Sequence, residues 1–135
     1  MNEIEILIEA EVNPTEDIEK VKLAVENVFG TLKYEVKELH RGKVLIARAK
    51  GTAGLTKLYN LLRRERIRDA ARAVLFEGAN EHSITFYLNK QVAYAGHISF
   101  CKPVAESPLG PIKVQIKCEN PKELIDWLAP KTTTS

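Results

Sequence analysis

The 135-residue chain has little of what marks a disulfide-stapled, metal-binding or membrane-spanning protein. It holds two cysteines, Cys101 and Cys118, and its three histidines are not spaced with them as zinc ligands. No apolar run approaches the roughly 20 residues of a membrane span, and the first residues lack the regions of a signal peptide. We therefore expect a cytoplasmic protein with reduced, structural cysteines, no metal and no other cofactor.

The sequence motifs of common enzymes are also missing. The chain has no P-loop, no dinucleotide-binding glycine pattern, no nucleophile elbow and no metal-binding carboxylate pattern. Aromatic residues make up only 7% of it, and neither a ribonucleoprotein-type aromatic motif nor a GXXG clamp is present. These absences favour a protein that is not an enzyme, and they exclude the common RNA-binding modules.

What the chain does contain is the composition of one ordinary globular domain. Hydrophobic residues make up 44% and charged residues 28% of the sequence. A chain of this length buries roughly two thirds of the surface that it exposes when unfolded, so no second domain is needed. We expect a single domain over residues 1–130 and a disordered, threonine-rich tail over residues 131–135.

The net charge of +2 conceals a strong asymmetry along the chain. Residues 1–30 carry eight acids against two lysines, whereas residues 31–72 carry twelve basic residues against four acids. From residue 73 onward the charges cancel. A basic middle segment is the electrostatic footprint of a surface that attracts phosphates.

Alternating and helical patterns predict the order of the elements. Apolar and acidic residues alternate over residues 4–12, as in a strand with one buried face, and residues 32–36 and 44–49 predict a hairpin. Asn13-Pro14-Thr15-Glu16 predicts the start of a helix that ends near Gly30, and Asn120-Pro121-Lys122-Glu123 repeats this motif. Further strands are expected at residues 83–88, 96–101 and 112–118, with a turn or short helix over residues 89–95.

The basic segment predicts two helices or one bent helix. Apolar positions Leu55, Leu58 and Leu62 are out of phase with those that begin at Ile67, which places a break near residues 63–66. Hairpin-linked strands and grouped helices predict an α+β fold with a largely antiparallel sheet and helices packed on it.

Arg64, Arg68 and Arg72 are four residues apart, so we expect them to form one stripe on a helix. Arginine suits phosphates because its planar fork can hold two phosphate oxygens. The alternative is a solvated helix face with Glu65–Arg68 and Asp69–Arg72 ion pairs. The residues predicted to bind RNA are Lys57, Arg63, Arg64, Arg66, Arg68, Arg72 and Lys90.

Two aromatic side chains, Tyr87 and Tyr94, have a strand parity or context that could place them outward, where they would stack on unpaired bases. Lys90 and Gln91 collect polar donors at the end of a strand. The sequence SPLGP at residues 107–111 predicts a rigid corner rather than an anion-binding nest, because two prolines remove two N–H donors.

Two segments carry a resemblance to a known family: FYLNKQVAYAG at residues 86–96 and SPLGPI at residues 107–112. They resemble the signature of a small archaeal family of uncharacterised, RNA-binding-like proteins. The resemblance implies a fold similar to that of the ribosomal large-subunit protein that contacts 5S RNA. It also implies a homodimer and an RNA-binding role connected with the exosome.

Three functions stay open at this stage. The leading hypothesis is a non-enzymatic protein that recognises structured RNA through its basic helical surface. The alternative is a homodimeric scaffold subunit whose basic face meets an acidic protein partner. The third is an enzyme acting on a small phosphorylated substrate near Lys90, Gln91 and the corner at Ser107.

Overall fold

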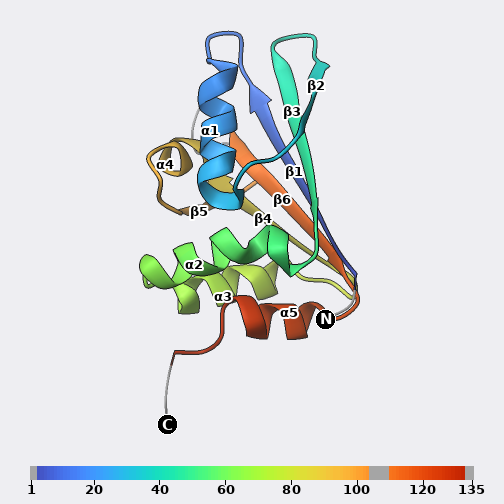
Figure 1. The fold of residues 1–135 in the computed structure, drawn as a ribbon, viewed down its shortest axis with the longest axis vertical. Helices are drawn as coiled ribbons and strands as arrows, with labels where there is room; N and C mark the ends of the chain where they lie inside the picture. Colours follow the sequence, from blue (N-terminus) through green and yellow to red (C-terminus); the bar gives the residue numbers. More distant parts are fainter. Residues whose placement is uncertain (1–2, 104–109, 133–135) are drawn as a thin grey trace.

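The computed structural model describes residues 3–103 and 110–132. Within them, six antiparallel strands form one sheet in the order β2-β3-β1-β6-β4-β5 (Figure 1). The strands are β1 (Ile4–Val12), β2 (Tyr34–Glu38), β3 (Lys43–Lys50), β4 (Ser83–Asn89), β5 (Phe100–Cys101) and β6 (Pro111–Cys118). The helices are α1 (Ile18–Phe29), α2 (Thr56–Arg64), α3 (Arg68–Glu77), α4 (Lys90–Tyr94) and α5 (Pro121–Leu128), with a 3-10 turn at Thr52–Leu55. The predicted α+β class is confirmed.

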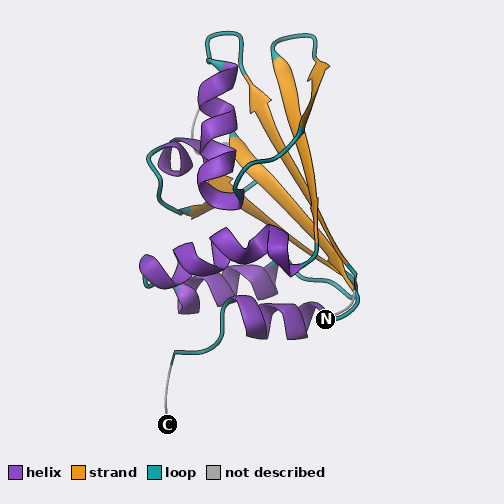
Figure 2. Cartoon of the chain, viewed as in Figure 1, coloured by secondary structure: helices purple, strands orange, loops and turns teal. Residues whose placement is uncertain are grey.

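The helices gather on one side of the sheet, α1 and α4 near one end of the strands and α2, α3 and α5 near the other (Figure 2). The alternation along β1 explains this arrangement, because Ile4, Ile6 and Ile8 are buried while Glu3 and Glu5 are exposed. Branched side chains of β1, β3, β4 and β6 therefore meet the apolar stripes of the helices in one core.

The two Asn-Pro-x-Glu motifs have different outcomes. At α5 the prediction is confirmed, since the Asn120 side chain accepts a hydrogen bond from the Glu123 N–H and Pro121 opens the helix. At α1 it is wrong, because the helix begins at Ile18 with Asp17 as its cap. The predicted reciprocal contact still forms there, since Glu16 Oε1 accepts hydrogen bonds from both nitrogens of Asn13.

The described residues also test the predictions for the segment after β4 and for the cysteines. The short helix expected after β4 is present as α4, and the strand expected over residues 96–101 shrinks to two residues. Cys101 and Cys118 are both free, and burial raises the pKa of the Cys118 thiol. No described helix is long and apolar enough to cross a membrane.

The domain limits stay a prediction, and the tail lies partly outside the described residues, which end at Thr132. Thr132 donates hydrogen bonds from its N–H and its hydroxyl to the Asp69 carboxylate on α3. The corner predicted at residues 107–111 lies mostly outside the described residues as well.

Candidate nucleic-acid interface

The basic segment contains two helices, and the residue that separates them has an unusual backbone. Arg66 has φ +57°, the left-handed region that favours glycine. Its N–H donates to the Arg63 carbonyl at 3.2 Å, and the Ile67 N–H donates to the Leu62 carbonyl at 3.1 Å. These two bonds form the Schellman motif that ends many helices, in which the left-handed position is usually a glycine. Here it carries an exposed arginine.

This break divides the arginine stripe, so the prediction of one continuous stripe is wrong. Arg64 ends α2 and Arg68 begins α3, and the two side chains do not share a helix face. The exposed Arg64 guanidinium donates to the Gly96 carbonyl at 2.8 Å, beside α4. The pKa of Arg63 is lowered chiefly by burial, with the nearby charge of Arg68 acting in the same direction.

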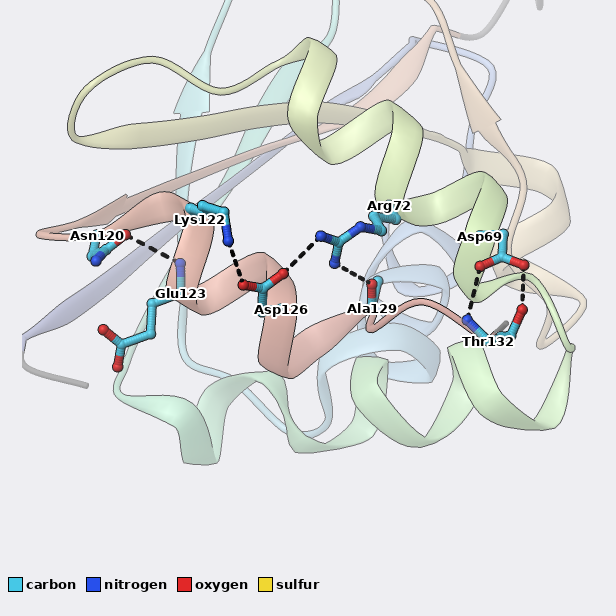
Figure 3. A network of polar contacts seen from close by, with 8 residues as sticks. All are labelled: Asp69, Arg72, Asn120, Lys122, Glu123, Asp126, Ala129 and Thr132. Atoms are coloured by element: carbon cyan, nitrogen blue, oxygen red, sulfur yellow. Dashed lines mark hydrogen bonds and ion pairs between the residues drawn. The ribbon is translucent and has the colours of Figure 1, made fainter. Parts of the chain in front are cut away.

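Arg63 and Arg72 hold the end of α5. Arg63 donates to the carbonyls of Trp127 and Leu128 at 3.3 and 3.1 Å, and its guanidinium carbon lies 3.3 Å from the centre of the Tyr59 ring. Arg72 donates to the Ala129 carbonyl at 3.3 Å and pairs with Asp126 at 2.7 Å (Figure 3). Cations satisfy the last carbonyls of a helix and complement its dipole. The structure therefore gives these two arginines a role within the fold.

Asp126 makes this clamp sensitive to acid. Hydrogen bonds from Lys122 and Arg72 hold the pKa of Asp126 below its usual value. A carboxyl with a depressed folded pKa contributes stability above its unfolded pKa, and this contribution is lost as the pH falls through the folded pKa.

We expect Asp126→Asn to remove that part of the acid sensitivity. The difference in unfolding free energy between wild type and variant should narrow as the pH falls below about 4. Urea titrations at a series of pH values measure it, with Glu81→Gln in an exposed loop as the control. A difference that stays constant with pH would contradict the assignment.

The two predicted lysines occupy opposite environments. The Lys57 amine donates to the Glu26 carbonyl at the end of α1 at 2.8 Å and is exposed. Lys90 is only 4% exposed, and its amine donates to the Glu11 carbonyl at 2.6 Å and pairs with Glu16 at 3.0 Å. Burial raises the pKa of Glu16, but hydrogen bonds from Asn13 and Lys90 outweigh it, and the pKa is lowered. A phosphate cannot reach Lys90 in this arrangement.

The α2–α3 corner is tied to the segment that follows α4. Glu65 Oε1 lies 2.8 Å from His97 Nδ1 and accepts a longer hydrogen bond from the Ile98 N–H. The hydrogen bond with His97 lowers the pKa of Glu65, so the carboxylate stays charged at neutral pH. Sequence reasoning missed this contact because Glu65 and His97 are 32 residues apart. With the Arg64–Gly96 bond, it fixes the position of the corner.

The tyrosines that are candidates for base stacking differ in exposure. Tyr94 is 43% exposed and Tyr87 is half-buried, whereas Tyr34 and Tyr59 pack against the core. In the described part of the chain, no cluster of three or more histidine, cysteine or acidic side chains could hold a metal ion. Exposed cations along α2 and at the α2–α3 corner include Lys57, Arg64 and Arg66, which we call the basic face.

Comparisons with known proteins identify the family of the chain. A family model described as RNA binding matches residues 5–118 of the chain. A UPF0201 protein from Saccharolobus solfataricus is 41% identical over 129 residues, which cover 96% of this chain and 89% of that protein. The chain belongs to the UPF0201 family.

Other UPF0201 proteins extend the match to solved structures. The protein from Sulfolobus acidocaldarius is 46% identical over 127 residues, covering 94% of this chain and 88% of its own length. The crystal structure of the UPF0201 protein from Methanococcus jannaschii has a TM-score of 0.86 at 37% identity and covers 96% of this chain and 95% of that chain. A DUF54 protein from Methanothermobacter thermautotrophicus, 21% identical with a TM-score of 0.63, covers 94% of this chain and 99% of its own and shows the fold alone. The predicted archaeal family is confirmed, and the likeness to the ribosomal protein stays a prediction.

Proposed function

We propose that this UPF0201 protein binds structured RNA through the basic face, Lys57, Arg64 and Arg66. The matching family is described as RNA binding, which supports the class of ligand. The geometry supports the place, because these three cations are exposed. Lys57 and Arg64 lie seven residues apart on the side of α2 that meets α1 and α4, at Glu26 and Gly96. The proposed contacts are with the phosphate backbone, which fixes the position of the RNA but carries no sequence information.

The observation that carries this proposal is the conformation of Arg66. A non-glycine residue in the left-handed region is disfavoured by about 1 kcal/mol, and the end of a helix is where glycine relieves this strain. Within the described residues the exposed Arg66 side chain donates no hydrogen bond, so no side-chain contact offsets this strain. Strained positions of this kind cluster at functional sites.

The proposal narrows the set of predicted RNA-binding residues. Arg63 and Arg72 are engaged at the end of α5, and Lys90 is enclosed with Glu16. Arg68 is half-buried and is left out of the proposed contact. The predicted homodimer, acidic protein partner and exosome-related partner stay predictions, as does the absence of enzymatic activity.

We expect Arg66→Gly to raise the stability of the protein and to weaken its binding to RNA. The variant should gain about 1 kcal/mol in unfolding free energy, because glycine accepts the left-handed conformation without strain. It should lose one phosphate contact, which weakens RNA binding several-fold. The slope of log affinity against log salt concentration should become less steep by about 1. Urea unfolding and a salt titration with a structured RNA measure the two effects.

The matched control is Arg41→Gly in the exposed turn between β2 and β3, at the opposite end of the molecule from the α2–α3 corner (Figure 1). It removes the same charge and should leave the RNA affinity close to wild type. Equal losses in the two variants would show that only the net charge matters. No binding of wild type to structured RNA at about 50 mM salt would overturn the proposal.

A further inference from the structure

Tyr94 is an exposed aromatic side chain on a fixed main chain. Its ring is 43% exposed at the end of α4. The Asn27 side-chain amide of α1 donates to the Ala93 carbonyl at 2.9 Å and to the Tyr94 carbonyl at 3.1 Å. A ring on a preorganised backbone loses little entropy when a flat ligand stacks on it.

A cavity of about 290 Å³ lies between the start of α1 and α4. Its lining is mostly apolar and includes Thr15, Lys20, Val21, Ala24, Gln91 and Tyr94. The Lys20 amine is 6.0 Å from the centre of the Tyr94 ring, at the limit of a cation–π contact. An aromatic wall, an apolar floor and a mobile cation at the rim are what a nucleotide with an unstacked base requires.

The charges at this cavity favour a base over a phosphate inside it. Asp17 and Glu16 also line the cavity, and the Lys90 amine beside them is bonded to Glu16. The carboxylates would repel a phosphate group but can accept hydrogen bonds from the amino group of a base. Gln91 is exposed and adds an amide with both donors and acceptors.

Short stretches of chain connect the lining of the cavity to residues bonded by the basic face. Tyr94 is two residues from Gly96, whose carbonyl accepts from Arg64 at 2.8 Å. Asn27, which holds Tyr94, is adjacent in α1 to Glu26, whose carbonyl accepts from Lys57. Figure 1 shows α4 beside α1 and the end of α1 close to α2. Lys57 and Arg64 are thus bonded to the carbonyls of residues close to Asn27 and Tyr94 in the chain, and Lys20 lies 6.0 Å from the centre of the Tyr94 ring.

We propose that Tyr94 and this cavity bind one unpaired nucleobase of the RNA whose phosphates lie on the basic face. This inference rests on the proposed RNA binding and adds to it the form of the ligand, a loop or bulge with an unstacked base. A fully paired duplex would contact the basic face alone.

The test compares two RNA probes of equal length: a hairpin pool with a randomised single-stranded loop, and a fully paired duplex. Tyr94→Leu should weaken hairpin binding about tenfold and leave duplex binding unchanged, because only the hairpin offers a base to stack. Tyr94→Phe, which keeps the ring, should bind like wild type. Phe76→Leu, at a 39% exposed aromatic residue on α3, is the matched control and should also bind like wild type.

A second measurement does not depend on affinity. A hairpin pool that carries 4-thiouridine in the loop should crosslink under ultraviolet light to the peptide that contains Tyr94, as mapped by mass spectrometry. The base site is refuted if Tyr94→Leu binds the hairpin like wild type and the crosslink lies elsewhere. If Arg66→Gly still weakens binding in that case, the proposal of RNA binding through the basic face is kept. If wild type binds neither probe, both proposals are refuted.

Discussion

Replacing Lys90 by methionine should lower the unfolding free energy by about 3 kcal/mol at neutral pH. The Lys90 and Glu16 side chains are 5% and 11% exposed, and their charged atoms lie 3.0 Å apart. Methionine keeps the length of the side chain but leaves a buried carboxylate without its cation, and breaking one partner of a buried pair costs about 3–5 kcal/mol. The Glu11 carbonyl also loses its donor at 2.6 Å. Urea unfolding followed by circular dichroism measures the loss.

An ion pair with the same distance between its charged atoms provides the control. Lys122 and Asp126 also lie 3.0 Å apart, but their side chains are 72% and 43% exposed. Lys122→Met should cost no more than about 0.5 kcal/mol, because exposed pairs of this kind contribute little. Adding Glu16→Gln to Lys90→Met should restore part of the loss, since the uncompensated charge is removed. Similar losses for the two lysine variants would contradict the role given to Lys90.

Gly78→Ala should lower the unfolding free energy by about 3 kcal/mol or more. A Cβ atom at Gly78 would lie 1.9 Å from the Thr85 carbonyl oxygen, a backbone atom that cannot rotate away. The Thr85 N–H also donates to the Gly78 carbonyl at 2.9 Å, so the end of α3 and the start of β4 are held at this separation. Relief of the overlap requires moving one element, and overpacking of this kind costs at least 1–3 kcal/mol.

Gly30→Ala is the matched control for this substitution. Gly30 has φ +84°, yet nothing lies within 4 Å of the position that a Cβ would take. Together with ψ −171° this φ defines a backbone region that essentially only glycine occupies, so the cost of Gly30→Ala should be the conformational strain alone, about 1–3 kcal/mol. Thermal and chemical denaturation of both variants give the comparison. If Gly78→Ala loses less than about 1 kcal/mol, the close approach of α3 to β4 is not a constraint on the fold.

The sequence predicts those parts of the fold that depend on residues close together in the chain. The alternation in β1 and the cap at Asn120 are local patterns, and both predictions are confirmed. The same Asn-Pro-x-Glu motif at Asn13 does not start the helix, because Glu16 also binds Lys90, 74 residues away. A tertiary ion pair thus fixes Glu16 in a turn, and no local pattern could reveal it.

The candidate interface shows the same division. The phase shift between Leu62 and Ile67 predicts the break in the basic segment, but not the side that each arginine takes afterwards. That choice depends on the carbonyls at the end of α5 and at Gly96, which are distant in sequence. Four-residue spacing therefore predicts a stripe only while one helix continues.

The pairing of β1 with β6 has a consequence for the synthesis of the protein. Ile4 pairs with Cys118 and Ala10 with Ile112, so β1, which lies third in the order of the sheet, needs a partner made more than a hundred residues later. The ribosome must synthesise nearly the whole chain before β1 is enclosed on both sides, and until then β1 can pair only with β3. Contacts between such distant segments slow folding, and the nascent chain must keep the apolar residues of β1 from other chains during this interval.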